Sequence, residues 1–187
     1  MPDQGNVVIV TGANRGIGLA IAERLSHDRY EIAACVRSRS SELEQLLYQS
    51  DDQNDRHKIF EMDLANKDSI REAVKSIFAW KRQVVALVNC AGMAQGSLFS
   101  MTRMTDLQTV FEVNYFAQIY LTQLVVKKMI RAKSGSIVNI ASTAGILADA
   151  GTLSYGCSKA ALIHASKIMA TELGVYGIRV IDPCFLV

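Results

Sequence analysis

Three side chains in the last third of the sequence could act together on a carbonyl group. Tyr155 and Lys159 lie four residues apart, so on a helix they share one face and their polar ends can meet. An unperturbed phenol titrates at about 10, and a neighbouring positive charge favours the phenolate. Tyr155 could then act as a general acid in a reduction and as a general base in an oxidation. Ser142 lies thirteen residues before Tyr155, and its hydroxyl could hold a substrate oxygen.

The same residue types also occur in ordinary surroundings. A Tyr and a Lys at this spacing often form a pair on the surface of a helix, and Thr143 offers a second hydroxyl beside Ser142. Whether the three side chains can do chemistry together therefore depends on the elements that position them.

Strand-like and helix-like segments alternate along the chain. Six short apolar runs are typical of buried parallel strands, and five segments with apolar residues three and four apart are typical of helices. The predicted strands are Val7–Val10, Ile32–Val36, Ile59–Phe60, Val84–Val88, Ile137–Ile140 and Ile178–Ile181, and the predicted helices are Gly16–His27, Ser41–Gln49, Lys67–Trp80, Thr105–Arg131 and Leu153–Val175. This order predicts an α/β fold, one domain over residues 1–187, with a doubly wound parallel sheet and helices on both faces. We expect the strand order 3-2-1-4-5-6.

The segment VTGANRGIG, residues 10–18, places three glycines between the first predicted strand and the first predicted helix. Glycines at such a turn allow backbone N–H groups to approach a pyrophosphate at the amino end of a helix. A tight turn can also need glycines for steric reasons alone, so this segment indicates a nucleotide site only together with other motifs.

Composition narrows the function classes. The chain is 50% hydrophobic and 20% charged with a net charge of +2, and its scattered basic residues give no reason to expect nucleic acid as a partner. No apolar stretch approaches the length that spans a bilayer, so we expect no membrane and a cytoplasmic location. Four cysteines and three histidines lie apart without the spacing of a metal site, and no metal is predicted.

Together with the glycine segment, four further motifs resemble those of the short-chain dehydrogenase/reductase family, from residue 7 to about residue 183. They are MDL at 62–64, NCAG at 89–92, FEVNYFA at 111–117, and the segment that holds Ser142, Tyr155 and Lys159. The resemblance implies a Rossmann-type fold and a catalytic set of Ser142, Tyr155, Lys159 and Asn114. Asn114 would support a proton relay, although a helix Asn can also simply bend the helix.

The resemblance also implies a bound nicotinamide cofactor. Lys159 would reach the nicotinamide ribose, Asp63 the adenine, and the NCAG segment would steady the sheet and line the cofactor. The predicted cofactor-binding residues are Gly12, Asn14, Arg15, Gly16, Ile17, Gly18, Arg37, Asp63, Leu64, Asn89, Ala91, Gly92, Tyr155 and Lys159.

The end of the second predicted strand favours NADP(H) over NAD(H). An NAD site usually has an acid there that accepts hydrogen bonds from the ribose 2′-hydroxyl. This strand ends with Val36 and is followed by Arg37, and Arg15 in the glycine segment could supply a second guanidinium to a 2′-phosphate. Arg37 and Arg39 could otherwise be solvated loop charges.

Among members of the family, the chain resembles the 3-oxoacyl-carrier-protein reductase branch of fatty acid biosynthesis most. The resemblance implies NADPH-dependent reduction of a 3-oxoacyl thioester or another ketone, and a homodimer or homotetramer formed through helices 105–131 and 153–175. Cys184 stands where the family has a Gly, and the sequence given stops at Val187. A substrate-covering segment and a seventh strand are therefore expected to be missing. The alternative is a catalytically impaired short form that binds nucleotide weakly or pairs with other subunits.

Overall fold

Six parallel strands form one sheet in the order β3-β2-β1-β4-β5-β6, which confirms the predicted order. The structure is a computed structural model that describes residues 5–48 and 56–183. The strands are β1 (Asn6–Thr11), β2 (Glu31–Val36), β3 (His57–Glu61), β4 (Gln83–Asn89), β5 (Gly135–Asn139) and β6 (Ile178–Ile181). Each predicted strand is present, and the short run at 59–60 is the middle of a five-residue strand.

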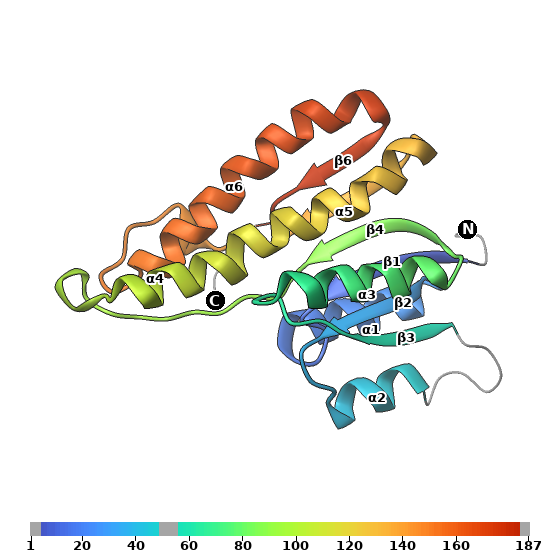
Figure 1. The fold of residues 1–187 in the computed structure, drawn as a ribbon, viewed down its shortest axis with the longest axis horizontal. Coiled ribbons are helices and arrows are strands. Elements are labelled where there is room, and N and C mark those ends of the chain that lie inside the picture. Colours follow the sequence, from blue (N-terminus) through green and yellow to red (C-terminus); the bar gives the residue numbers. More distant parts are fainter. Residues whose placement is uncertain (1–4, 49–55, 184–187) are drawn as a thin grey trace.

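Helices lie on both faces of the sheet, as predicted (Figure 1). They are α1 (Gly16–His27), α2 (Ser41–Tyr48), α3 (Lys67–Ala79), α4 (Met104–Phe111), α5 (Ala117–Ala132) and α6 (Leu153–Leu173). Helices α1 and α2 cover one face of the sheet at strands β1 to β3. Helices α3, α5 and α6 lie against the opposite face of the sheet. Helix α2 agrees with the predicted helix 41–49 as far as Tyr48, and Gln49 and Cys184 lie outside the described residues.

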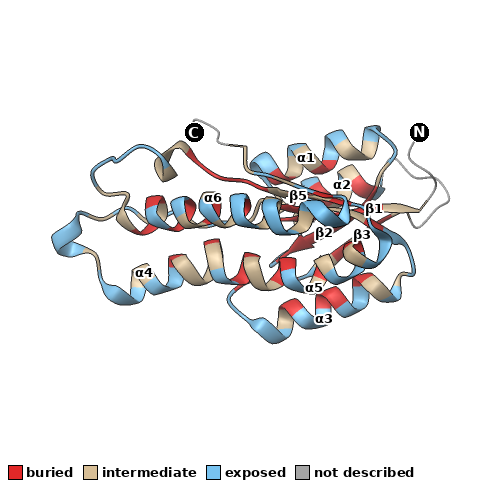
Figure 2. Cartoon of the chain, turned by 90° about the horizontal axis from the view of Figure 1, so that it is seen from above, coloured by how far each residue is buried: buried red, intermediate tan, exposed pale blue. Residues whose placement is uncertain are grey.

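The alternation of side chains along β1 explains why the sheet has a core on each face. Val7 and Ile9 belong to the hydrophobic cluster beneath α3 and α5, whereas Val8 and Val10 belong to the cluster beneath α1 and α2. All six residues of β2 are buried as well. Residues 7–10 of β1 and 32–36 of β2 form continuous apolar runs, which is typical of parallel strands covered on both sides, and Figure 2 shows the burial of both strands.

The predicted helix 105–131 differs from the observed structure. It consists of α4 and α5 joined by a π-helical segment, Glu112–Phe116, whose backbone stays helical at both junctions. A π turn takes one residue more than an α turn and often occurs at functional sites. Asn114, one of the predicted site residues, lies in the middle of this segment. The predicted helix 153–175 ends at Leu173, and a 3-10 turn, Gly174–Tyr176, follows it.

The carboxyl ends of the strands bring the predicted motifs to one edge of the sheet. Thr11 lies opposite Cys35, Val36 opposite Glu61, and Asn89 opposite Asn139. The glycine segment follows β1, and the NCAG and Ser142 segments follow β4 and β5. Among the described residues, no helix is long and apolar enough to cross a membrane.

Candidate active site

The glycine segment is packed so closely that two of its glycines have no room for a side chain. Gly12 has φ +68°, and a Cβ built on it would lie 2.8 Å from the Cα of Ala91. A Cβ on Gly18 would overlap the carbonyl oxygen of Gly12. Gly16 differs, because a Cβ there would meet no atom of the described residues within 4 Å. The turn thus presses against the NCAG segment on one side and opens to solvent at Gly16.

Gly18→Ala should therefore destabilise the protein by roughly 3 kcal/mol, the upper end of the usual cost of overpacking, because the backbone at Gly12 has to move. Gly16→Ala is the matched control: its Cβ has room, and only the left-handed backbone at φ +54° opposes it, at roughly 1–2 kcal/mol. Urea unfolding of the two variants compares them. If Gly16→Ala destabilises the protein more than Gly18→Ala, this account of the close packing is wrong.

The amino end of α1 fits a phosphate group. The side chain of Arg15 makes no capping hydrogen bond there, and the first turn contains no acidic residue. The first N–H groups of a helix lack partners within the helix and attract anions. The open space at Gly16 and these N–H groups together form a cradle that a pyrophosphate fits.

The NCAG segment is tied to the end of β1 by a hydroxyl group. The Oγ1 of Thr11 accepts hydrogen bonds from the backbone N–H groups of Cys90 and Ala91, both at 3.0 Å. Gly92 follows, and a Cβ on it would lie 3.3 Å from the Oδ1 of Asn114 and 3.6 Å from the Nζ of Lys159. The segment therefore runs directly from the glycine turn to the predicted catalytic lysine.

A chain of buried polar groups lies beneath this segment. The Nδ2 of Asn89 donates to the Oγ1 of Thr122 at 3.0 Å and to the Oδ1 of Asn139 at 2.8 Å. Asn139 donates in turn to the Oγ of Ser166, which donates to the carbonyl oxygen of Leu162. We call these groups the polar chain. The Asn89 side chain is fully buried, so it steadies the sheet, and its predicted contact with a cofactor stays a prediction.

Ser142 lies just after β5 with its hydroxyl oriented by the backbone. Its Oγ accepts a hydrogen bond from the N–H of Ala144 at 3.2 Å, at the start of a 3-10 turn, Thr143–Gly145. The side chain is almost fully buried. Since the oxygen accepts this bond, the hydroxyl hydrogen stays available to a carbonyl oxygen.

Tyr155 and Lys159 lie on one face of α6, as their spacing predicts. The Nζ of Lys159 is 5.9 Å from the centre of the Tyr155 ring and donates to the carbonyl oxygen of Ile140 at 2.7 Å. The Lys159 side chain is only 3% exposed. This burial lowers the pKa of its ammonium from 10.5 to about 8, and the nearby Cys90 thiol partly offsets the effect. Lys159 therefore loses its proton at a lower pH than a lysine that is exposed to water.

Asn114 connects the π-helical segment to two other parts of the site. Its Oδ1 accepts from the N–H of Met93 and its Nδ2 donates to the Met93 carbonyl oxygen, both at 2.8 Å. The Nδ2 also donates to the Oγ of Ser158 at 3.1 Å. Its amide thus holds α6 and the segment after β4 together, and its predicted support of a proton relay stays a prediction.

The loop after β2 is fastened to the glycine segment. The Oγ of Ser40 donates to the carbonyl oxygen of Asn14 at 2.8 Å, so Arg15 and Arg37 lie on neighbouring loops. Arg39 lies within 3.7 Å of the Glu44 carboxylate and 4.0 Å of the Glu61 carboxylate. Among the described residues, neither Arg15 nor Arg37 forms an ion pair, and both are exposed. Their guanidinium groups are therefore available to a ligand.

The remaining predicted cofactor residues lie at the same edge. Asp63 follows β3, and its Oδ1 accepts from the N–H of Ala65 at 2.9 Å, which leaves the second carboxylate oxygen to other partners. Leu64 belongs to the core, and Ile17 is 42% exposed beside the glycine turn. The structure thus brings every predicted site residue to the carboxyl edge of the sheet. Within residues 5–48 and 56–183, no group of acidic, His or Cys side chains could hold a metal ion.

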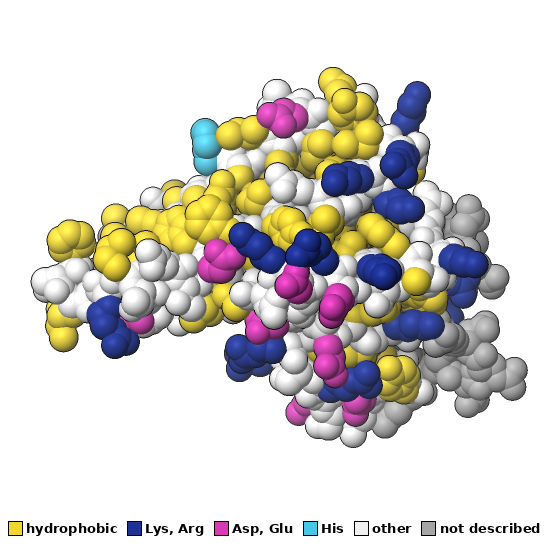
Figure 3. All heavy atoms as spheres, in the orientation of Figure 1, with side chains coloured by type: hydrophobic (Ala, Val, Ile, Leu, Met, Phe, Trp, Pro, Cys, Tyr) yellow, Lys and Arg dark blue, Asp and Glu magenta, His cyan; other side chains and the backbone are white. Residues whose placement is uncertain are grey.

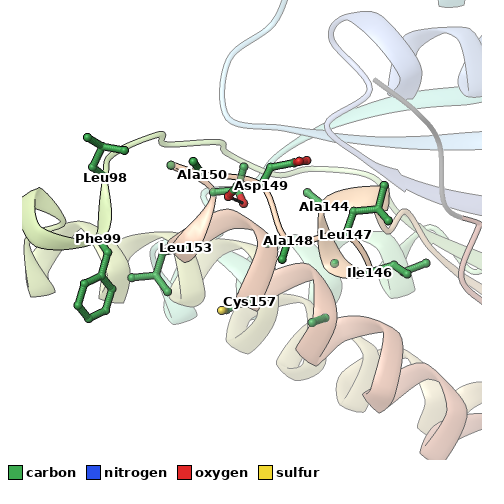
Figure 4. A pocket seen from close by; sticks show the side chains of 15 residues that line it. Leu98, Phe99, Ala144, Ile146, Leu147, Ala148, Asp149, Ala150, Leu153 and Cys157 are labelled. Atoms are coloured by element: carbon green, nitrogen blue, oxygen red, sulfur yellow. Dashed lines mark hydrogen bonds between the residues drawn. The ribbon is translucent and has the colours of Figure 1, made fainter.

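Figure 4 shows an open pocket of about 520 Å³ beside the first turns of α6. Most of its lining is apolar, with Leu98 and Phe99 on one side. Leu153, Cys157 and Ala160 line it from α6 and share one face of that helix, because they lie four and three residues apart. Tyr155 and Lys159 lie two residues after Leu153 and Cys157, respectively. They therefore project from a different face of α6. The lining also includes Ala144 and Gly145, which lie two and three residues after Ser142, and Gly156, which directly follows Tyr155, so the pocket lies beside the predicted catalytic residues.

Thr11, Ser158 and Gln118 were missed in the sequence, although each holds part of the site. Gln118 carries the clearest signal, because it continues the apolar positions Leu121 and Val125 on the buried face of α5. A polar residue on such a face needs a specific partner. Thr11 and Ser158 have no comparable signal, since small hydroxyl residues are common at strand ends and in helices.

Comparison with known proteins identifies the family. The profile described as short chain dehydrogenase matches residues 6–184. Nodulation protein G of Rhizobium meliloti strain 1021 is 35% identical over 184 residues, which cover 97% of this chain and 74% of that protein. The 3-oxoacyl-(acyl-carrier-protein) reductase FabG of Aquifex aeolicus is 32% identical over 189 residues, covering 98% of this chain and 75% of that protein. The chain thus spans about three quarters of these relatives' length.

Solved structures agree with this result. A short-chain dehydrogenase from Streptomyces avermitilis superposes with a TM-score of 0.89 at 30% identity, covering 97% of this chain and 71% of that one. A 4-hydroxyisoleucine dehydrogenase complexed with NADH and succinate gives 0.85 at 28% identity, with coverages of 96% and 79%. A gluconate 5-dehydrogenase from Burkholderia cenocepacia in complex with NADP and tartrate gives 0.88 at 25%, with coverages of 98% and 71%. The chain belongs to the short-chain dehydrogenase/reductase family. It is an oxidoreductase of the class that acts on small molecules with a nicotinamide cofactor.

Proposed function

We propose that this chain reduces a ketone to an alcohol with NADPH, with Tyr155 as the proton donor. The observation that carries the proposal is the placement of Tyr155 and Lys159 on one face of α6. The Lys159 ammonium also donates a hydrogen bond to the carbonyl oxygen of Ile140, two residues before Ser142. The Ser142 hydroxyl keeps a hydrogen to donate. A hydrogen-bond donor, a phenol and an ammonium together suit a carbonyl oxygen that gains negative charge.

The proposed reaction moves one hydride and one proton. NADPH, when bound, supplies the hydride to the carbonyl carbon, and the C=O π electrons move to the oxygen. Ser142 holds that oxygen by a hydrogen bond, and Tyr155 donates its phenolic proton to it, which completes the alcohol. The Lys159 ammonium stabilises the phenolate that remains until solvent returns a proton. In the oxidation direction, Tyr155 accepts the proton instead.

The proposed cofactor site uses the cradle at the amino end of α1 for the pyrophosphate. Gly12, Asn14, Gly16 and Ile17 lie on the turn that forms this cradle, and Gly18 allows its close packing. In this proposal Asp63 and Leu64 bind the adenine, and Ala91, Gly92 and Lys159 support the nicotinamide ribose.

The preference for NADP(H) rests on Arg37 and Arg15. Both guanidinium groups are exposed and lack ion-pair partners among the described residues, whereas Glu61, which lies opposite Val36 in the sheet, faces Arg39. Arg15 and Arg37 can therefore bind a 2′-phosphate. The related solved structures hold NADH in one case and NADP in another, so they support a nicotinamide cofactor without favouring either form.

Arg37→Ala should weaken NADPH binding by roughly 10–150-fold and NADH binding much less, since a hydrogen bond to a charged group contributes about 1.5–3 kcal/mol. Arg39→Ala is the matched control, because Arg39 already faces two carboxylates. Fluorescence titration of both cofactors against the three proteins measures this. Equal losses for NADPH and NADH would contradict the proposed phosphate site.

The proposed substrate is a 3-oxoacyl thioester or a related ketone. It is supported by the relative from Aquifex aeolicus, whose name describes a 3-oxoacyl-(acyl-carrier-protein) reductase. Such an activity would belong to fatty acid biosynthesis. Steady-state NADPH oxidation with a 3-oxoacyl thioester and a panel of simple ketones tests the proposal. It fails if none of these compounds accelerates NADPH oxidation and the chain binds no NADPH.

We further propose that copies of the chain pair through the α4–α5 and α6 helices, as a homodimer or homotetramer. Exposed apolar side chains support this, because Phe116 on the π-helical segment and Ile168 on α6 are 51% and 47% exposed. Figure 3 shows a further group of hydrophobic side chains at the end of the molecule that projects to the left. Phe99, Met101 and Met104 are 65–81% exposed there. Such patches on a protein surface often mark contacts with another chain. The alternative function is pairing with other subunits or weak nucleotide binding, without catalysis.

A further inference from the structure

Gln118 is a fully buried polar residue on the face of α5 that packs against the sheet. Its side chain is 0% exposed, and its neighbours on the same face include Leu121, Thr122 and Val125. Burial of an amide in apolar surroundings costs free energy unless its polar atoms are paired. The partners of Gln118 therefore explain what the residue does.

The amide of Gln118 holds the backbone of the NCAG segment. Its Nε2 donates to the carbonyl oxygen of Ala91 at 2.7 Å. A carbonyl oxygen can only accept, so the NH₂ group of the amide has to face it. The backbone N–H of Ala91 donates to the Oγ1 of Thr11. Two buried side chains from different elements thus fix both polar backbone groups of Ala91.

Ala91 lies where the two halves of the proposed cofactor site meet. The Cα of Ala91 limits the space at Gly12 on the phosphate side, and the adjacent Gly92 limits the space beside Lys159 on the catalytic side. A rotation of the Ala91–Gly92 peptide would move the surface on which the nicotinamide half of the cofactor has to rest. The hydrogen bond from Gln118 opposes that rotation.

The other polar atom of the Gln118 amide is its carbonyl oxygen, Oε1. Its Oε1 is buried and accepts no hydrogen bond from the described residues. An unpaired buried acceptor destabilises the folded state, and an apolar side chain of similar volume would avoid this loss. Gln118 is therefore a poor choice for packing alone, which separates a positioning role from a merely structural one.

We propose that Gln118 is a positioning residue that acts through the Ala91 carbonyl to hold the support for the nicotinamide half of the cofactor. This inference rests on the proposed NADP(H) site. It predicts a selective effect: ligands that occupy the nicotinamide half depend on Gln118, and ligands that occupy only the adenine half do not.

The test compares two ligands on three proteins. Gln118→Met keeps the length of the side chain and removes its amide, and Gln123→Met is the matched control on the exposed side of the same helix. Isothermal titration with NADP⁺ and with adenosine 2′,5′-bisphosphate separates the two halves, because the bisphosphate lacks the nicotinamide. Gln118→Met should weaken NADP⁺ binding by roughly 3–10-fold and bisphosphate binding by less than about 2-fold. Its urea unfolding midpoint should change little, because removal of the unpaired Oε1 offsets loss of the hydrogen bond to the Ala91 carbonyl oxygen.

The outcomes are distinguishable. Equal weakening of both ligands together with a lower unfolding midpoint would mean that Gln118 is only structural, and unchanged NADP⁺ binding would mean that Ala91 does not need it. Either result overturns the inference and leaves the proposed function intact. If the unaltered chain binds neither ligand, the proposed function fails, and this inference fails with it.

Discussion

Tyr155→Phe should lower the turnover number for ketone reduction by about 10²–10⁴-fold, which is the usual contribution of a general acid. Phe keeps the aromatic ring and its contact with Lys159, and it removes only the hydroxyl that supplies the proton. NADPH affinity should therefore change by less than about 2-fold, because the ring still fills its place. Steady-state NADPH oxidation and fluorescence titration measure the two quantities separately.

Tyr176→Phe is the control for this substitution. Tyr176 follows α6, is 42% exposed, and lies outside every group assigned to the reaction. Its loss of a hydroxyl should leave turnover unchanged. Full turnover in Tyr155→Phe would show that the proton comes from elsewhere, whereas lost cofactor binding would show that the phenol holds the cofactor rather than reacting.

Lys159→Met should make the protein more stable near neutral pH while turnover falls. Burial lowers the pKa of the Lys159 ammonium from 10.5 to about 8, so between these values the unfolded chain binds more protons than the folded protein. The free energy of unfolding therefore rises with pH across this window, and below about pH 8 the folded protein carries the full penalty. That penalty is about 3 kcal/mol. Loss of the hydrogen bond to Ile140 offsets part of the gain, which leaves about 1–2 kcal/mol of stabilisation.

The pH dependence separates this explanation from a packing effect. The stability difference between Lys159→Met and the unaltered chain should fall by about 3 kcal/mol between about pH 7 and pH 10.5, so that the variant becomes the less stable protein at the higher pH, as measured by urea unfolding. Lys167→Met on the exposed side of α6 should show no such change. A constant difference across this range would contradict the buried ammonium as its source.

The fold was predictable because the apolar runs of its strands and the apolar spacing of its helices are both clear in the sequence. Val7–Val10 and Ile32–Val36 are continuous apolar runs with helix-like segments between them, and a parallel sheet covered on both faces buries such runs. The carboxyl ends of parallel strands then meet, so the glycine segment, Asn89 and Ser142 had to share an edge. Chain order and side-chain hydrophobicity are local properties, and here they determine the arrangement.

The parts that the sequence did not reveal depend on contacts between distant segments. Nothing in EVNYF breaks a helix, and its π turn accompanies the hydrogen bonds of Asn114 to Met93 and Ser158. The bond from Gln118 to Ala91 likewise joins residues 27 positions apart. Propensity and spacing describe neighbours in the chain, so such long-range pairs appear only once the fold brings them together.

The polar chain from Asn89 through Asn139 to Ser166 has a consequence for which structure the sequence selects. Apolar strands such as β4 and β5 could slide past each other with little loss of hydrophobic contact. A shift of one residue would turn Asn139 to the opposite face of β5 and leave buried amides without partners. Misaligned arrangements are thereby penalised even where their apolar surfaces match. Two asparagines and a serine thus distinguish the native alignment from its nearest competitors.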